Sequence, residues 1–361
     1  LQRSGAALAK AGITTETPQP EGGEIVHDES GRPVGLLLGQ PASTMVSDLA
    51  LQVKGLKGSI LRLLDVFREL GITAVGDMFP RDLSNDDIYD TYREIEQDGD
   101  LTCRITFFPS VLDGVIEAHT AFMLEPYEGT DQRGETNLPP DEFKRLVRAA
   151  DAVGLPVRVH CIGDASARLA LDAHEEAQAA NGRKELHHCL EHIETIADED
   201  IERMAALGIG ASVQPLHATF GSSTGFYDVC IGADRASRCW RFRTVRDAGV
   251  PLGLSTDFPA APMVLPLQVL YAAVARCMPD GQPAEGFHRE YALALGEALQ
   301  CMTQGSAWVE SFDHELGTLE PGKLADIVVI DRNLFAVDDL HEIAEASVVT
   351  TIVGGETVFV R

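Results

Sequence analysis

Three side chains that can bind a metal or carry a proton each follow a short apolar run. His160 stands in RVHCIGD, His192 in CLEHIE and Asp257 in LSTDFP. Two imidazoles and one carboxylate form a ligand set that zinc accepts while keeping an open position for water. A metal held there would lower the pKa of its bound water towards neutrality and polarise a substrate carbonyl. Asp257 is the candidate that takes the water proton and returns it to the leaving group.

The other polar and aromatic candidates carry weaker signals. His217, in QPLHATF, follows a fourth apolar run and is predicted to contact the substrate. His187 and His188 stand just before a strand and are predicted to be solvated or packing residues. His174 lies in ARLALDAHEEAQAA, on the predicted polar face of a helix, and Trp240 is interpreted as a core or lid aromatic.

A unit made of a helix end, a glycine, a short apolar run and a polar residue recurs four times. Each glycine stands where a left-handed residue ends a helix, and the runs are apolar throughout, as in parallel strands covered by helices. Asp77, His160 and Gln214 each lie six residues beyond their glycine, and Asp257 lies eight beyond Gly249. One of the helices carries apolar residues at the spacing of a single face, namely Phe143, Leu146, Val147 and Ala150.

Polar residues at the carboxyl ends of parallel strands predict a (β/α) barrel, because the active site of a barrel is built at that end. A doubly wound open sheet gives the same local pattern. It usually brings a glycine-rich phosphate loop after its first strand, however, and the sequence has none. The barrel is therefore the favoured fold.

The sequence patterns at the two ends of the chain differ from the helix–glycine–strand unit of the predicted barrel. Residues 22–38 predict a hairpin with an Asp-Glu-Ser-Gly turn, preceded by the helix-forming RSGAALAKAGI, and the final 45 residues or so contain short β runs separated by Gly and Pro turns. We therefore divide the chain into an insertion belonging to the catalytic domain (1–48), the barrel domain (49–315) and the C-terminal part of a small β domain (316–361).

Composition narrows the class of partner. The 361 residues are 45% hydrophobic and can bury a full core, while 29 basic against 56 acidic residues give a net charge of -27. That balance argues against nucleic acid and anionic membranes, because both need a basic surface. Seven scattered cysteines without a CxxC pair predict reduced thiols in a cytoplasmic protein. We expect a small-molecule substrate, and a homodimer is left open.

Several motifs, in order, resemble the amidohydrolase superfamily, and within it amidohydrolase family 3, the branch of YtcJ-like proteins and N-substituted formamide deformylase. They are LAKAGITTETPQPEGGEIVHDESGRPVGLLL, TAFMLEPY, VRVHCIGDASARLALDAHEEA, LEHIETIADEDIERMAALGIGASVQPLHA, GVPLGLSTDFP and GTLEPGKLADIVVID. The resemblance implies an α/β fold, a (β/α)8 TIM barrel with a small β-sandwich built from both chain ends. It also implies a strand-five ligand at His160, a strand-six ligand at His192 and a strand-eight acid at Asp257.

Features that the resemblance implies are absent from the sequence. No His-x-His pair occurs near the start, Gly39 stands near a position where a glutamate is expected, and no lysine precedes LDGVIEAHTA, where Ser110 and Val111 stand. Parallel neighbours need a crossover of about a dozen residues. LTCRITFFPS, predicted as strand three, nevertheless leads directly into VLDGVIEA, a segment that by the family resemblance follows strand four. We therefore predict that strands one and four are missing from this sequence, with a break between Ser110 and Val111.

The resemblance implies a metal-dependent hydrolase of a C–N bond, in an amide or an N-acyl or formamide-type compound, attacked by a metal-bound hydroxide with Asp257 as general base and acid. Zinc is the first choice of metal, as one or two ions. Isomerisation or decarboxylation on the same scaffold is an alternative, because a fold does not determine its reaction. A true deletion would instead leave a catalytically impaired binding or regulatory paralogue.

Overall fold

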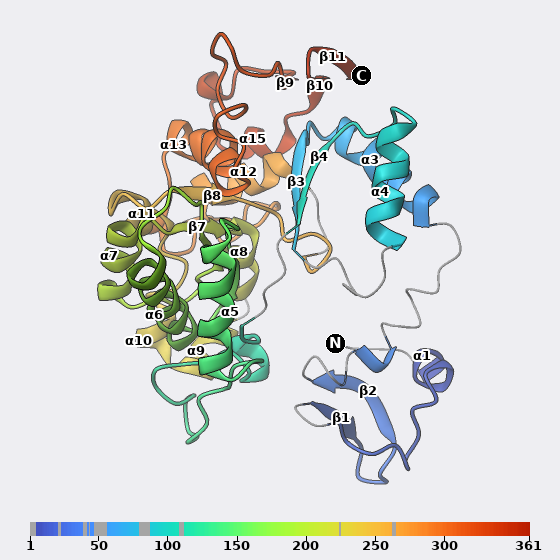
Figure 1. Ribbon diagram of the computed structural model, residues 1–361, viewed down its shortest axis with the longest axis vertical. Coiled ribbons are helices and arrows are strands. Elements are labelled where there is room, and N and C mark those ends of the chain that lie inside the picture. Colours follow the sequence, from blue (N-terminus) through green and yellow to red (C-terminus); the bar gives the residue numbers. More distant parts are fainter. Residues whose placement is uncertain are drawn as a thin grey trace. The chain divides into compact units, whose positions relative to one another are not determined.

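The computed structural model describes residues 5–20, 23–38, 42, 44–46, 56–78, 87–107, 112–223, 225–261 and 265–361. The chain forms two compact units, Leu1–Ile60 and Leu61–Arg361 (Figure 1). The predicted break between Ser110 and Val111 lies outside the described residues, as does Gly39. Within the described ranges, no helix is long and apolar enough to cross a membrane.

The first unit contains the predicted N-terminal helix and hairpin. They are α1 (Gly5–Lys10), β1 (Glu24–His27) and β2 (Pro33–Leu38), with β1 and β2 antiparallel. Asp28 organises the turn, since its Oδ1 accepts hydrogen bonds from the backbone N–H groups of Ser30 (2.9 Å) and Arg32 (3.0 Å). Gly31 takes a left-handed φ of 79° there. The predicted Asp-Glu-Ser-Gly turn is confirmed.

Six parallel strands are described in the second unit, in two sheets. The first sheet pairs β3 (Ala74–Asp77) with β4 (Arg104–Phe107), and the second orders β5 (Arg158–Cys161), β6 (Cys189–His192), β7 (Gly210–Val213) and β8 (Leu252–Leu254). The glycines before β3, β5, β7 and β8 all have positive φ, at Gly71, Gly154, Gly208 and Gly249. The predicted helix–glycine–strand unit is confirmed, and the fold is mixed α/β.

Helices lie before and between these strands along the chain and continue after β8 (Figure 1). They are α3 (Leu56–Glu69), α4 (Asp87–Gln97), α5 (Pro140–Ala152), α6 (Asp164–Asn181), α7 (Asp198–Leu207), α8 (Pro215–Ser223), α9 (Phe226–Ile231), α10 (Ala233–Ala236), α11 (Phe242–Asp247), α12 (Pro266–Ala275), α13 (Leu295–Gln300), α14 (Ser306–Val309) and α15 (His341–Glu345). In α5, Phe143 and Val147 are buried as their spacing predicts, but Leu146 is 42% exposed. The buried face of α5 is therefore narrower than the apolar pattern.

The chain ends in an antiparallel sheet of β9 (Ile327–Ile330), β10 (Val348–Val353) and β11 (Glu356–Val360), with β10 in the centre. This confirms the predicted C-terminal β runs. The sheet packs against the end of α3, where the Thr351 hydroxyl donates to the Arg68 carbonyl at 2.7 Å. Gly71 leaves room for this contact, because a Cβ there would lie 2.8 Å from a methyl group of Val328.

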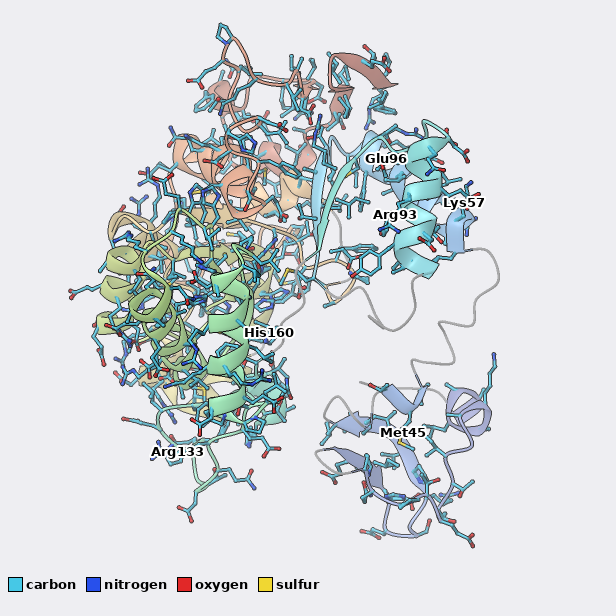
Figure 2. The ribbon with its side chains drawn as sticks, viewed as in Figure 1. Met45, Lys57, Arg93, Glu96, Arg133 and His160 are labelled. Atoms are coloured by element: carbon cyan, nitrogen blue, oxygen red, sulfur yellow. The ribbon has the colours of Figure 1, made fainter. Side chains whose placement is uncertain are left out.

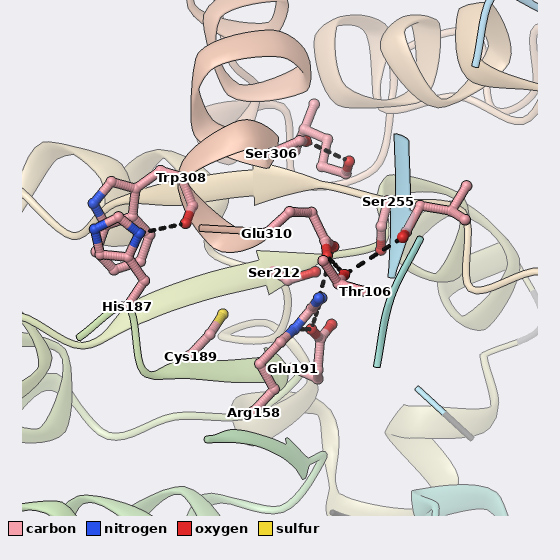
Figure 3. Close-up of polar contacts among 12 residues, drawn as sticks. Thr106, Arg158, His187, Cys189, Glu191, Ser212, Ser255, Ser306, Trp308 and Glu310 are labelled. Atoms are coloured by element: carbon pink, nitrogen blue, oxygen red, sulfur yellow. Dashed lines mark hydrogen bonds and ion pairs between the residues drawn. The ribbon is translucent and has the colours of Figure 1, made fainter. Parts of the chain in front are cut away.

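A buried ionic network joins the two parallel sheets (Figure 3). Arg158 Nε donates to Glu191 Oε1 at 2.8 Å and Nη1 donates to Glu310 Oε1 at 2.6 Å, while the Thr106 hydroxyl also donates to Glu310. A Cβ on Gly76 would lie 2.6 Å from Arg158 Nη1, so the guanidinium passes directly over β3. Burial alone would lower the pKa of Arg158, but the two carboxylates outweigh it and the net shift is upward.

The prediction that His174 lies on a polar helix face is wrong. Its side chain is fully buried, because α6 packs against α5 on one side and α7 on another. Neither ring nitrogen has a hydrogen-bond partner within the described ranges, and the ring lies 4.5 Å from that of His188. Burial, reinforced by His188, lowers the pKa of His174 to about 3. The imidazole is therefore held neutral.

This buried histidine makes stability sensitive to acid. Because the folded-state pKa is depressed from 6.5 to about 3, the unfolded chain binds the proton first, so stability is complete above pH 6.5 and falls as the pH drops through that window. We expect His174→Leu to retain about 2 kcal/mol more of its pH 7 unfolding free energy at pH 5 than the wild type does. Urea unfolding at both pH values measures this difference.

The control is His314→Leu, since the His314 side chain is 69% exposed. Its loss of stability between pH 7 and pH 5 should match that of the wild type. Carboxylates are common to all three proteins, so their titration cancels in the comparison. Equal losses in His174→Leu and the wild type would contradict the assignment of acid sensitivity to this ring.

Candidate active site

His160 and His192 meet at the carboxyl ends of β5 and β6. Their ring centroids lie 4.4 Å apart in an edge-to-face arrangement, and Figure 2 marks His160 in the second unit. The register pairs His160 with Glu191, so strand alternation would turn His192 to the opposite face. A left-handed φ of 70° at His192 breaks that alternation. Non-glycine residues rarely adopt this conformation, and such strain gathers at functional sites.

Asp113 holds the His160 ring. Its Oδ1 lies 3.2 Å from His160 Nδ1, and its side chain is fully buried. The carboxylate also accepts hydrogen bonds from the backbone N–H groups of Phe122, Ile162 and Gly163 and from the hydroxyl of Ser166. Burial opposes protonation of His160, but Asp113 outweighs it and raises the pKa of the ring. Because Asp113 accepts at Nδ1, the His160 Nε2 lone pair is left for a ligand.

Gln214 holds the His192 ring in the same way. Gln214 Oε1 lies 2.8 Å from His192 Nδ1, while the Gln214 amide nitrogen donates to Ser255 Oγ at 2.9 Å and to Glu191 Oε2 at 3.3 Å. The two donor contacts orient the amide with its oxygen towards the histidine. Burial, followed by the neighbouring His160 and His217, holds the pKa of His192 well below its usual range. A neutral imidazole with a free Nε2 is the form that binds a metal.

The third side of the site brings Asp257, His217 and Glu194 together. Asp257 follows β8 with a φ of 55°, and its Oδ2 lies 3.5 Å from His217 Nε2. His217 Nδ1 lies 3.2 Å from Glu194 Oε1. Burial raises the pKa of Asp257 to about 6, against the lowering effect of His217. Within the described ranges, the three groups whose ligand atoms all lie within 4.8 Å of one another are His192, Glu194 and His217.

The site contains three residues whose contacts with the histidines the sequence did not predict. Gln214 was visible as a strand-end polar residue, but its hold on His192 was not. Asp113 stands in the LDGVIEA segment without a local signal of its role, and Glu194 follows the predicted ligand in CLEHIE. All three are buried, and each lies within hydrogen-bonding distance of a histidine of the site.

The other candidates singled out from the sequence, His187, His188 and Trp240, are packing residues. His187 stacks on Trp308 at 4.2 Å between ring centroids, with Nδ1 2.8 Å from the Trp308 carbonyl (Figure 3). His188 is buried, accepts a hydrogen bond from the Val157 N–H at 3.0 Å and lies beside Asp151. Trp240 is 2% exposed and belongs to the core.

The amidohydrolase family profile matches residues 3–359. The chain belongs to the amidohydrolase family. It is 28% identical to the putative amidohydrolase YtcJ of Bacillus subtilis over 384 residues, covering 98% of the chain and 71% of that protein. It is 26% identical to N-substituted formamide deformylase of Arthrobacter pascens over 396 residues, covering 97% and 70%. Protein LONG AFTER FAR-RED 3 of Arabidopsis thaliana is 29% identical over 392 residues, covering 98% and 66%.

The chain spans about two thirds of the length of these relatives. Each alignment is also longer than the 361 residues of the chain, so the relatives have residues within the matched region that this amidohydrolase lacks.

Solved structures agree with this assignment. A metal-dependent hydrolase from Pyrococcus horikoshii superposes with a TM-score of 0.74 at 23% identity, covering 93% of this chain and 70% of the other, and shows the same fold. A metal-dependent hydrolase from Pyrococcus furiosus gives 0.67 at 26% identity, covering 87% and 67%. The family, the neighbour from Pyrococcus furiosus and the grouped His and Glu side chains support a hydrolase that uses a divalent metal.

A substitution at Gln214 tests whether its contact with His192 orients that ring for metal binding. Gln214→Leu keeps the approximate volume but removes the acceptor that orients His192. We expect zinc affinity to fall about 10- to 100-fold, the usual effect of losing a group that orients a metal-binding histidine. Competition with a chromophoric chelator measures the affinity, and circular dichroism should show that the fold is retained.

The matched control is Gln178→Leu, which removes a glutamine hydrogen bond to the Leu207 carbonyl in α7, away from the site. Its zinc affinity should equal that of the wild type. Unchanged zinc affinity in Gln214→Leu would show that His192 does not need the Gln214 amide in order to bind zinc.

Proposed function

We propose that this protein is a zinc-dependent amidohydrolase that cleaves the C–N bond of a small amide, N-acyl or formamide-type compound. The observation that carries the proposal is the pair His160 and His192, 4.4 Å apart between ring centroids, with each Nδ1 held by an acceptor. His160, His192 and Asp257 would hold the ion, and this donor set suits zinc. The ion would polarise the substrate carbonyl and lower the pKa of a bound water.

The protein's own groups would then position the reactants and move the proton. Asp113 and Gln214 keep the two histidine rings from turning. Asp257 takes a proton from the attacking water and passes it to the departing nitrogen, which leaves more readily as a neutral amine. Burial raises the pKa of Asp257 to about 6, and a cation beside the carboxylate would lower it again.

The proposal includes a complete eight-stranded barrel. In such a barrel, the six parallel strands of the described ranges would be strands two, three and five to eight. Strands one and four would bring the His-x-His pair and the lysine that the family resemblance implies, and they would decide between one ion and two. In the relatives, the matched region holds additional residues, which is where such strands would lie.

Asp257→Asn separates proton transfer from metal binding. Asparagine keeps the size and one oxygen of the side chain but cannot carry the proton. We expect the full-length variant to retain its zinc and to lose about 10²- to 10⁴-fold in turnover, the usual contribution of general acid–base catalysis. Elemental analysis measures the zinc. The turnover assay uses N-formyl and N-acetyl amines that the wild type hydrolyses.

Asp234→Asn is the control, because the Asp234 side chain is 90% exposed, and it should behave as the wild type. Full turnover in a zinc-loaded Asp257→Asn protein would remove Asp257 from the proton-transfer role. Loss of zinc together with activity would make it a ligand whose part in proton transfer lacks support.

A further inference from the structure

His217 lies between two carboxylates at the edge of the candidate site. It stands in the first turn of α8, directly after β7, with its side chain 21% exposed. Nδ1 lies 3.2 Å from Glu194 Oε1, and Nε2 lies 3.5 Å from Asp257 Oδ2. The second distance is longer than a full hydrogen bond, and catalytic contacts often tighten only when the ligands are bound.

Glu194 is a rigid anchor for this ring. Its side chain is buried, and the Tyr227 hydroxyl donates to its Oε2. The backbone N–H of Trp240 donates to the Glu194 carbonyl at 2.9 Å, and the Tyr227 ring packs on the Trp240 ring with 4.4 Å between centroids. The backbone and the carboxylate of Glu194 are therefore both held in place. The His217 ring, whose Nδ1 faces this carboxylate, is oriented with its Nε2 towards Asp257.

The side-chain conformation of Asp257 depends on the contact with His217. Its backbone has a left-handed φ of 55°, and 31% of its side chain is exposed. An acidic side chain at a strand end, partly open to solvent, has several rotamers to choose from. The His217 contact selects one of them by holding Oδ2, which leaves Oδ1 for the ion or the attacking water.

We propose that His217 is a positioning residue for Asp257, held in place by Glu194 and Tyr227, rather than a substrate contact. This inference rests on the proposed function only in taking Asp257 as a metal ligand. The competing assignment makes His217 a ligand itself, with His192 and Glu194, since those ligand atoms lie within 4.8 Å of one another. The two assignments predict different responses to substitution.

The test measures zinc affinity, by chelator competition, in full-length proteins with alanine, glutamine or asparagine at position 217. An orienting group contributes about 10- to 100-fold to metal affinity, so His217→Ala should weaken zinc binding by that factor. His217→Gln places an amide N–H near the former Nε2 and should recover most of the affinity. His217→Asn places its amide near Nδ1, towards Glu194, and should not.

A double variant shows whether His217 acts through Asp257. If it does, Asp257→Ala/His217→Ala should bind zinc no more weakly than Asp257→Ala alone, because alanine at position 257 removes the ligand oxygen that His217 would hold. An equal loss from His217→Ala in both backgrounds would make His217 an independent ligand and overturn the proposal. No loss in either background would overturn it as well.

Two further measurements keep this test apart from the proposed function. The free energy of unfolding without zinc should be measured for the wild type, Asp257→Ala, His217→Ala and the double variant. The losses from the two single substitutions should be non-additive in the double variant. Additive losses would count against the contact between the two side chains, whatever metal the protein binds. A wild type that binds zinc with the expected pattern but hydrolyses no N-acyl or formyl amine would reject the proposed reaction. The positioning role would then still stand.

Discussion

The buried guanidinium of Arg158 is the interaction on which the arrangement of the parallel strands depends. Arg158, on β5, bonds to Glu191 on β6 and to Glu310 after α14, passes over Gly76 on β3, and shares Glu310 with Thr106 on β4. Removing one partner of a buried pair costs about 3–5 kcal/mol, because the remaining charge is left without compensation. The network therefore constrains every strand that it joins.

The same network extends to the candidate site. Glu191 accepts from Gln214 at 3.3 Å, and Gln214 in turn reaches Ser255 after β8 and holds the His192 ring. The orientation of a candidate ligand is thus determined by a charge cluster in the sheet interior. A rigid scaffold of this kind holds a metal site more precisely than a loop does.

Asp113 plays the corresponding part around His160. It collects donors from the segment before α5, from the turn after β5 and from α6, and the turn fits only because Gly163 has no side chain. A Cβ on Gly163 would lie 2.0 Å from the Phe122 carbonyl oxygen. Left-handed backbone at His192 and Asp257 adds strain of about 1–3 kcal/mol per residue. The packed surroundings hold these conformations, and they bring both side chains to the site.

The sequence by itself determined the local structure and the residue types at the strand ends. Helix period, glycine caps and apolar runs predicted the parallel strands and pointed to His160, His192 and Asp257, because these signals lie within a few neighbouring residues. Only the tertiary structure decided how those groups are held. The Asp113–His160 contact spans 47 residues and the Arg158–Glu310 contact 152, so no local pattern could reveal them. His174 is buried and Leu146 exposed for the same reason, since burial depends on which elements pack against a helix.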